Sequence, residues 1–204
     1  MFDYDGVIMN SNHCPMIFYE KLAQRLGTKK FASWEECRAI LEANFELSLK
    51  RLGVLDKKKL NIATKLYHEH AELWKNLALF PNIKEILIQL KNMDYKLAIV
   101  SNNHNDIMIP DLKKNNVFDL FDHVIDNSIG YKPEITQIIH CLKLTGTNPD
   151  EAVLIDDMDG GIIAAKNAKL KKAIGVSYGY QLPHRLHMAD VIVDTPEEIL
   201  DVVE

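Results

Sequence analysis

From Asp94 onward, short apolar runs alternate with segments of helical periodicity, and this pattern constrains the fold more than any other feature of the sequence. The apolar runs predict strands at residues 95–100, 123–125, 152–155, 173–176 and 191–193. The i, i+3, i+4, i+7 spacing of a buried helix face occurs at Ile83, Ile86, Leu87 and Leu90, and again at Ile135, Ile138, Ile139 and Leu142. Strands that alternate with amphipathic helices predict βαβ units, so we expect an α/β fold with a doubly wound parallel sheet, a Rossmann-like core.

The segment between residues 12 and 78 has a different character. It lacks strand-like runs and is rich in Leu, Ala, Glu and Lys, which are strong helix formers. It predicts three helices, near residues 15–26, 33–52 and 56–78, and Ser33 followed by Glu36 predicts a capping box at the second of them. We therefore expect an all-helical cap domain at residues 12–78, inserted into an α/β core formed by residues 1–11 and 79–204.

The composition excludes several classes of protein. A net charge of −5 leaves no broad basic field to attract nucleic acid, and no apolar run approaches the roughly 18 residues of a membrane-spanning helix. The first residues carry neither the basic nor the apolar stretch of a signal peptide. Cys14, Cys37 and Cys141 form no CxxC pair, which favours reduced thiols over disulfides or a zinc site. We expect a soluble cytoplasmic protein, a monomer or homodimer, with no nucleic-acid and no membrane partner.

Two acidic pairs fall where strands are expected to end. In extended backbone the side chains alternate, so Asp3 and Asp5 project from the same face. Asp156 and Asp157 directly follow the apolar run 153–155. Ligands of open parallel sheets bind outside the carboxyl ends of the strands, so we expect these carboxylates to converge there. Hard oxygen ligands of this kind suit Mg²⁺.

Further polar residues are expected at the same edge of the sheet. Ser101 follows the apolar run 97–100, and Asn102 comes next, so hydroxyl and amide donors are available there. Lys132 stands between a glycine turn and a proline, where it would supply the positive charge that a phosphoryl group requires.

Structural explanations compete with this functional one. An Asp-Gly surface turn would account for Asp5, and helix capping would account for Asp157 or Asp159 ahead of two glycines. Each of these explanations covers one aspartate well. Neither explains four aspartates in matched positions at strand ends.

Four ordered motifs resemble those of the haloacid dehalogenase superfamily of phosphohydrolases, in the branch with an inserted helical cap that includes phosphoglycolate phosphatases and beta-phosphoglucomutases. The motifs are Asp3-Tyr4-Asp5-Gly6-Val7, Ser101-Asn102, Lys132-Pro133, and Asp156-Asp157 leading into Gly161-Ile162-Ile163-Ala164-Ala165. The likeness extends over practically the whole chain, including Phe80-Pro81-Asn82 at the junction of cap and core. The resemblance implies an enzyme that hydrolyses a small phosphorylated metabolite with the help of Mg²⁺.

The resemblance also implies a role for each motif residue. Asp3 would be the nucleophile that becomes an aspartyl phosphate, and Asp5 would first protonate the leaving oxygen and then activate water. The metal ligands would be Asp3, the backbone carbonyl of Asp5, Asp156 and Asp157. Ser101, Asn102 and Lys132 would bind the phosphoryl oxygens. An acid at position 5 favours phosphate esters over carbon–halogen bonds, because a halide leaves without a proton.

Two other functions fit parts of the pattern. A phosphomutase of the same architecture would pass the phosphoryl group to a second hydroxyl instead of water. A non-catalytic phosphoacceptor or phospho-binding module, similar to response-regulator receivers, would use the same residue types. Motif order counts against this module, because receivers place their lysine last, whereas Lys132 precedes Asp156 here.

The remaining features carry less information. Only Met1 and Phe2 precede Asp3, so we expect the start of this sequence to be truncated relative to the family. His68 and His70 are two residues apart on a predicted helix and cannot share a face, which argues against a histidine metal site. The other histidines considered as substrate contacts are His13 and His104. We interpret the aromatic residues of the cap as its core rather than as a substrate-binding surface: Phe18, Tyr19, Phe45, Tyr67 and Trp74.

Overall fold

The first residues of the chain join two groups of parallel strands into one sheet. The computed structural model describes residues 1–204 and contains the strands β1 (Ala98–Val100), β2 (His123–Ile125), β3 (Val153–Asp156), β4 (Lys172–Val176) and β5 (Val191–Val193). Strand β1 pairs with β2, and β3 with β4 and β4 with β5, all in parallel. Phe2 lies between the two groups and forms parallel bridges to both Ile99 and Ile155.

Backbone hydrogen bonds hold this central segment on both sides. The N–H of Phe2 donates to the carbonyl of Ala98 at 2.8 Å, and its carbonyl accepts from the N–H of Val100 at 2.9 Å. On the other side, the N–H of Asp3 donates to the carbonyl of Ile155 at 2.9 Å. The sheet order is therefore β2, β1, the Met1–Asp3 segment, β3, β4 and β5. This order places Asp3 between the ends of β1 and β3.

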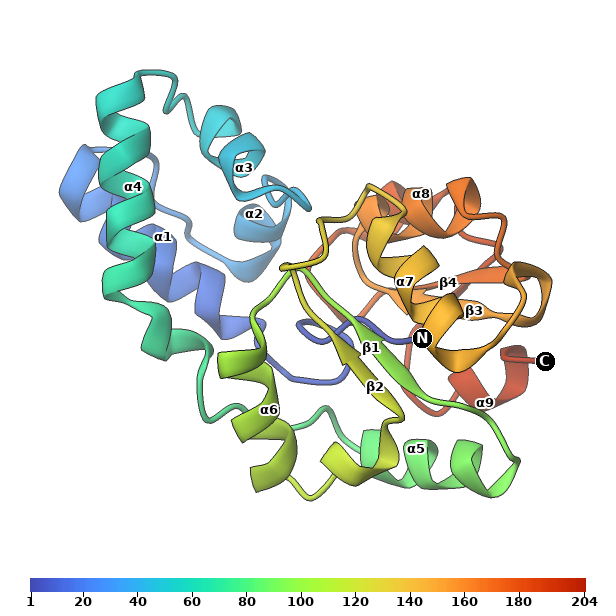
Figure 1. Cartoon of the computed structure of the whole chain (residues 1–204). Coiled ribbons are helices and arrows are strands. Elements are labelled where there is room, and N and C mark those ends of the chain that lie inside the picture. The colour runs from blue at the N-terminus through green and yellow to red at the C-terminus, as the bar shows by residue number, and fades with distance from the viewer.

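Apolar residues cover both faces of the sheet, as a doubly wound fold requires. One face packs under α7 (Thr136–Thr145) and α8 (Asp159–Asn167), and the other under α5 (Ile83–Asn92), α6 (Asn105–Lys114) and α9 (Ile199–Val202) (Figure 1). Alternate residues of β1 pack on opposite faces of the sheet. Ala98 and Val100 pack on the face covered by α7 and α8, whereas Ile99 packs on the face covered by α5, α6 and α9. The α/β doubly wound prediction is confirmed.

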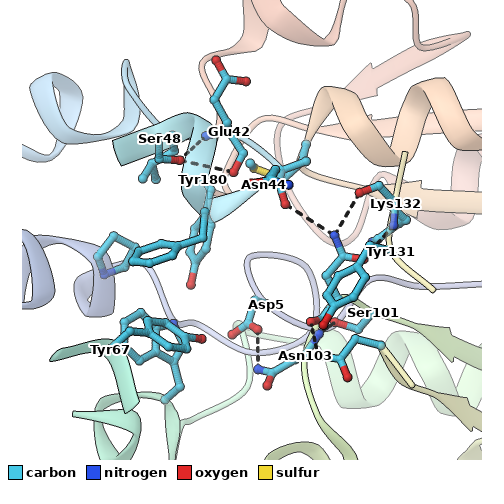
Figure 2. A pocket seen from close by; sticks show the side chains of 18 of the residues that line it. Asp5, Glu42, Asn44, Ser48, Tyr67, Ser101, Asn103, Tyr131, Lys132 and Tyr180 are labelled. Carbon is cyan, nitrogen blue, oxygen red and sulfur yellow. Dashed lines mark hydrogen bonds between the residues drawn. The ribbon is translucent and has the colours of Figure 1, made fainter. Parts of the chain in front are cut away.

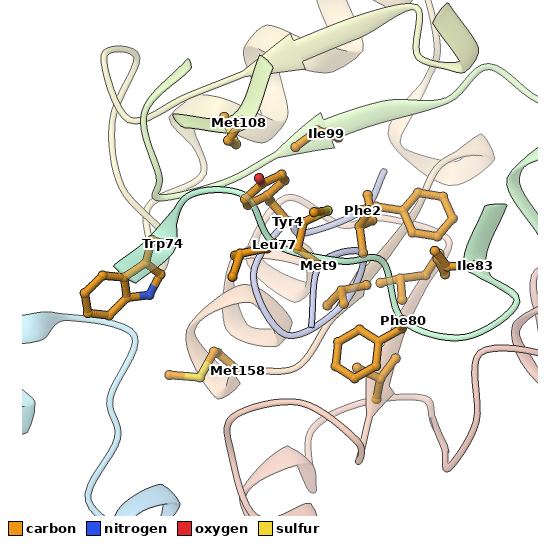
Figure 3. Close-up of a cluster of buried hydrophobic side chains, with 14 of the residues drawn as sticks. Phe2, Tyr4, Met9, Trp74, Leu77, Phe80, Ile83, Ile99, Met108 and Met158 are labelled. Atoms are coloured by element: carbon orange, nitrogen blue, oxygen red, sulfur yellow. The ribbon is translucent and has the colours of Figure 1, made fainter. Parts of the chain in front are cut away.

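The second of these faces extends under the first loop of the chain. Figure 3 shows the side chains of Phe2, Tyr4 and Met9 packed against Ile83, on α5, and Phe80. Tyr4 and Met9 are fully buried. The apolar core therefore holds the loop that follows Asp3 in place through the buried side chains of Tyr4 and Met9.

One predicted helix face is only partly correct. The predicted face of α5 is buried at all four positions. On α7, however, Ile138 and Leu142 are buried while Ile135 and Ile139 are exposed. The buried face of α7 is rotated, because Gln137 also turns inward, where its amide donates to the carbonyl of Ser101 at 2.7 Å.

The inserted segment is helical, but its helices are shorter than predicted. They are α1 (His13–Leu26), α2 (Trp34–Arg38), α3 (Phe45–Arg51), α4 (Lys57–Glu69) and the 3-10 helix η1 (Ala71–Trp74). A single helix at 33–52 is wrong, because the Asn44 side chain accepts from the N–H of Glu46 at 2.8 Å and begins a new helix there. The helix predicted at 56–78 ends at Glu69.

Ser33 begins α2 as expected: its hydroxyl accepts from the N–H of Glu36 at 3.2 Å. The return bond of the predicted capping box is absent, because the carboxylate of Glu36 accepts from the N–H of Ala32 instead. Strand β1 begins at Ala98 rather than at residue 95, since the N–H of Leu97 donates to the carboxylate of Asp122 at 2.7 Å. None of the helices combines the length and the apolar character needed to cross a lipid bilayer.

Candidate active site

Three aspartates and one lysine converge at the carboxyl ends of the central strands. Carboxylate oxygens of Asp3, Asp156 and Asp157 all lie within 4.8 Å of one another. The ammonium Nζ of Lys132 lies 3.0 Å from Oδ1 of Asp3 and 2.5 Å from Oδ2 of Asp156. All four side chains are buried. These residues belong to three motifs that are far apart in the chain, and the fold brings the motifs together.

The loop after Asp3 places a second carboxylate beside the first. Gly6 has a φ of +74°, a conformation that L side chains rarely adopt, and it turns the chain away from the sheet. A Cβ at this position would lie 2.1 Å from Oδ2 of Asp157. Gly6 is therefore required twice, for the turn and for the close approach of the carboxylate.

The carboxylate of Asp5 lies outside the three-aspartate cluster. Its Oδ2 accepts a hydrogen bond from the side chain of Asn103 at 2.7 Å, and its Oδ1 is buried with no hydrogen-bond partner. Burial raises the pKa of Asp5 to about 6, against the opposing effect of the Asn103 hydrogen bond. A carboxyl group with this pKa can hold a proton near neutral pH and can also release it.

The electrostatics of the cluster favour a cation. Burial, followed by repulsion from Asp156 and Asp3, raises the pKa of Asp157 well above its ordinary value, and Oδ1 of Asp157 is buried without a partner. Burial likewise raises the pKa of Asp156. For Lys132, burial opposes the charge, but Asp156 and Asp3 outweigh it and raise the pKa above its ordinary value. The single ammonium of Lys132 therefore does not balance the negative charge of three buried carboxylates. A further positive charge would be needed to do so.

The donor set fits a hard divalent cation. Carboxylate oxygens are the preferred ligands of Mg²⁺, whose bonds to oxygen are about 2.0–2.1 Å long, so oxygens within 4.8 Å of one another can share one ion. Two glycines keep the space around these oxygens clear. A Cβ on Gly161 would lie 1.9 Å from Oδ2 of Asp156, and a Cβ on Gly179 would lie 2.3 Å from Cβ of Asp157.

The remaining predicted residues line the same site. Ser101 is buried at the end of β1, and its hydroxyl accepts from the N–H of Asn103 at 3.2 Å. The side chain of Asn102 accepts from the N–H of Lys132 at 2.8 Å and donates to its carbonyl at 3.2 Å. Asn102 thus connects the Ser101 loop with the Lys132 loop. Figure 2 shows Asp5 joined to Asn103 by a hydrogen bond, with Ser101 next to Asn103.

Two residues to which the sequence assigned no specific role position this machinery; Asn103 was expected only as an amide donor at this edge of the sheet, and Gln137 was not expected there. Asn103 holds Asp5, and Gln137 donates to the carbonyls of Ser101 and Asp126 from a fully buried position. The second asparagine after Ser101 was a usable signal for Asn103. Gln137 gave none, because a glutamine on an amphipathic helix is ordinarily exposed.

A cavity of about 480 Å³ separates the carboxylates from the helical cap. Five aromatic side chains of the cap line it. One is Tyr19, and we call the other four the aromatic wall: Phe18, Phe45, Tyr67 and Trp74. They pack against one another, with ring centroids 5.5 Å apart for Phe18–Phe45 and 5.0 Å apart for Tyr67–Trp74. The interpretation of these residues as cap core alone is incomplete, because the same rings also face the cavity.

The histidines are divided between two environments. His68 and His104 line the cavity, whereas His13 and His70 do not. His104 lies with Nε2 3.1 Å from the side-chain nitrogen of Asn127. No histidine belongs to the three-aspartate cluster.

Two arginines join the cap to the core and were also missed. Arg38 of α2 is buried, and it donates to the carbonyl of Ser177 at 2.9 Å and to that of Tyr180 at 3.2 Å. Arg185 donates to the carboxylate of Glu42 at 2.7 Å and to that of Asp159 at 2.5 Å. These contacts hold the α2 end of the cap over the carboxylates. Arg38 lies in a predicted helix and Arg185 lies outside every predicted element, and neither position gave a signal of this role.

Comparisons with known proteins agree with this geometry. The family model of haloacid dehalogenase-like hydrolases matches residues 1–175. A phosphoglycolate phosphatase of Aquifex aeolicus is 25% identical over 209 residues, which cover 100% of this chain and 95% of the relative.

Solved structures share the fold over nearly the whole chain. A haloacid dehalogenase-like hydrolase of Streptococcus pneumoniae superposes with a TM-score of 0.86 at 20% identity, covering 100% of this chain and 96% of the other. A beta-phosphoglucomutase of Clostridium difficile superposes with a TM-score of 0.74 at 22% identity, covering 97% and 91%. With its four motifs assembled at the ends of the central strands, the chain belongs to the haloacid dehalogenase-like hydrolase family and is an enzyme of that family.

Proposed function

We propose that the protein is a Mg²⁺-dependent phosphatase that hydrolyses a small phosphate monoester through an aspartyl phosphate on Asp3. The observation that carries the proposal is the assembly of three buried carboxylates and Lys132 within hydrogen-bonding and metal-sharing distance, with Asp5 beside them on the same loop. The family and the phosphatase name of the Aquifex aeolicus relative support the same reaction class.

Asp3 attacks phosphorus in this mechanism. A carboxylate oxygen forms the new P–O bond while the bond to the leaving alkoxide breaks, which divides one difficult displacement into two easier ones. The N–H of Tyr4 donates to Oδ1 of Asp3 at 2.8 Å, and Lys132 contacts the same oxygen. These two donors hold one carboxylate oxygen, so the other oxygen is the one available for attack.

Asp5 transfers the proton in both half-reactions. In its protonated form it donates to the departing alkoxide, and as a carboxylate it then accepts a proton from the water that hydrolyses the aspartyl phosphate. Asn103 orients the side chain through its bond to Oδ2, which leaves Oδ1 free for this exchange. A pKa of about 6 is suited to both roles near neutral pH.

The charge of the phosphoryl group is balanced by this chain and by one ion. Bound between Asp3, Asp156 and Asp157, Mg²⁺ would neutralise the carboxylates and stabilise the charge of the transferring phosphoryl group. Lys132 and the Ser101 hydroxyl donate to phosphoryl oxygens, with the backbone of Asn102 beside them. The backbone carbonyl of Asp5 is proposed as a further ligand of the ion.

The experiment that tests the proposal is phosphate release from a panel of phosphorylated metabolites, with Mg²⁺ and with excess chelator. We expect turnover only with the metal. Asp3→Asn should abolish it, because the amide is not a nucleophile of comparable strength. Asp5→Asn should slow turnover by roughly 10²–10⁴-fold while leaving Mg²⁺ binding, measured by calorimetry, largely intact.

Outcomes of the same experiment identify the competing functions. Isomerisation of a sugar phosphate without net phosphate release would replace the phosphatase with a phosphomutase, whose fold this chain shares. Unchanged activity in Asp3→Asn or Asp5→Asn would remove the assigned roles. Mg²⁺-dependent phosphate binding with no turnover of any ester would leave a phospho-binding module.

A further inference from the structure

We propose that the alcohol released by this enzyme is neutral and carries a flat apolar or aromatic body, and that the enzyme discriminates against esters with a second negative charge. This inference rests on the proposed phosphatase function and names its substrate class. The inference follows from two features of the cap surface opposite the carboxylates. This surface carries the aromatic wall, and it contributes no lysine or arginine to the lining of the cavity.

The aromatic wall gives the leaving group an apolar surface. Tyr67 is its centre, with ring centroids 5.1 Å from Phe45, 5.8 Å from Phe18 and 5.0 Å from Trp74. Pro15 and Leu41 add further apolar area to the lining of the cavity. A planar apolar group placed against such rings gains both burial and ring–ring contact.

The charges around the cavity oppose a second anion. Among its lining residues, Lys132 is the only lysine and there is no arginine, and Lys132 already lies between Asp3 and Asp156. The cap contributes two acidic residues to the lining: Glu42, which is paired with Arg51 and Arg185, and Glu46, which is paired with Lys50. A carboxylate or second phosphate on the leaving group would therefore meet aromatic surface and glutamates that already occupy the nearby cations, with no lysine or arginine of the cap in the lining to offset its desolvation.

The nearest arginines do not fill this gap. Arg185 is bound to Glu42 and Asp159, and Arg38 donates to backbone carbonyls of the loop around Tyr180. Neither arginine lines the cavity. The other basic side chains of the lining are His68 and His104.

Four phosphate compounds test the inference. Benzyl phosphate carries the ring, methyl phosphate has an alkyl leaving group of similar basicity without the ring, 2-phosphoglycolate adds a carboxylate, and inorganic pyrophosphate adds a second phosphate. We expect kcat/KM for benzyl phosphate to exceed that for methyl phosphate by roughly tenfold or more, and both charged compounds to fall below methyl phosphate.

A variant series assigns the preference to the wall. Tyr67→Ala should lower the ratio of kcat/KM for benzyl over methyl phosphate by roughly tenfold, mainly through KM, whereas Tyr67→Phe, which keeps the ring, should preserve it. Phe31→Ala is the matched control, because Phe31 packs on Tyr19 in the same cap but does not line the cavity. Its ratio should equal that of the wild type.

The outcomes separate this inference from the proposed function. Preferred hydrolysis of 2-phosphoglycolate or pyrophosphate would overturn the neutral, apolar leaving group while leaving the phosphatase intact. An unchanged ratio in Tyr67→Ala would overturn the role of the wall. Turnover of none of the four compounds would overturn this inference, whereas the panel of phosphorylated metabolites decides the proposed function separately.

Discussion

The two sides of the cavity are built on opposite physical principles. On the core side, Asp3, Asp156, Asp157 and Lys132 are buried charges whose positions are fixed by strand ends, short loops and glycines that leave no room for a side chain. On the cap side, the aromatic wall consists of rings that pack against one another and expose one surface to the cavity. Buried charges tolerate almost no displacement, whereas apolar packing can adapt to a changed ligand. The comparison leads us to assign the proposed reaction to the core side and the proposed choice of substrate to the cap side.

The largest effect is expected from removing the only cation of the core side. Lys132→Met leaves Asp3 and Asp156 without their partner, and breaking a buried ion pair in this way costs about 3–5 kcal/mol of stability. Activity should fall roughly 10²–10³-fold, because a donor to the transferring phosphoryl group is lost. Urea unfolding and phosphate release measure the two effects.

The control for Lys132→Met is Lys59→Met on the exposed side of α4. It removes the same charge from the chain and should change neither quantity appreciably. Equal stability of the two variants would contradict a tightly paired Lys132.

The next effect separates backbone strain from collision with the site. Gly6 and Gly53 have similar backbone conformations, with φ of +74° and +76°. A Cβ on Gly6 would collide with the carboxylate of Asp157, whereas nothing lies within 4 Å of a Cβ on Gly53. Both Gly→Ala variants should lose about 1–2 kcal/mol from the left-handed conformation, but only Gly6→Ala should also lose most of its activity and Mg²⁺ affinity.

Comparison of the two variants by thermal unfolding, calorimetry and turnover sharpens the contrast. Wild-type activity in Gly6→Ala would mean that the carboxylate of Asp157 can move freely. That result would contradict the account of the core side as rigid.

A smaller effect is expected from adding a cation to the cap side. Thr64 lines the cavity one helical turn before Tyr67 and His68 on α4. Thr64→Lys should raise kcat/KM for 2-phosphoglycolate relative to methyl phosphate by roughly tenfold, because the ammonium offsets the second negative charge. Thr64→Gln, similar in length but neutral, should leave that ratio unchanged. An equal response in both variants would show that charge is not what the cap side lacks.

The smallest effect concerns an ion pair remote from the cavity. The N–H of Ala173 and the ammonium of Lys166 lower the pKa of Asp190 below its ordinary value. A folded-state pKa below the unfolded one gives stability that is present above about pH 4 and is lost as the pH falls further. The stability difference between wild type and Asp190→Asn should therefore shrink between about pH 6 and about pH 3, measured by denaturant unfolding. A constant difference would contradict this assignment.

Local patterns in the sequence were sufficient to predict the doubly wound core and the convergence of its motifs. The strands at 123–125 and 191–193 have the predicted bounds as short, mainly apolar runs, although both are edge strands that are only partly buried. The predicted site residues depend on strand ends, which such runs define. Asp3, Asp156 and Lys132 could therefore be grouped from the sequence alone.

What could not be predicted depends on contacts between distant segments. The break between α2 and α3 results from capping by Asn44 and from Arg38 reaching the loop of Tyr180, more than 130 residues further along the chain. The inward turn of Gln137 depends on the carbonyl of Ser101. The sequence did not predict that the aromatic wall lines a cavity. Periodicity alone does not distinguish a ring that faces only another ring from one that also faces a cavity.

The most direct test of the central claim is to trap the phosphorylated enzyme. An aryl phosphate with a weakly basic leaving group needs no proton from Asp5 in the first step, whereas hydrolysis of the intermediate still needs Asp5 as a base. Asp5→Asn mixed with such an ester labelled at phosphorus, then quenched with acid, should therefore accumulate label on the peptide that contains Asp3. Label on another residue, or release of phosphate with no labelled protein in this variant, would contradict the account.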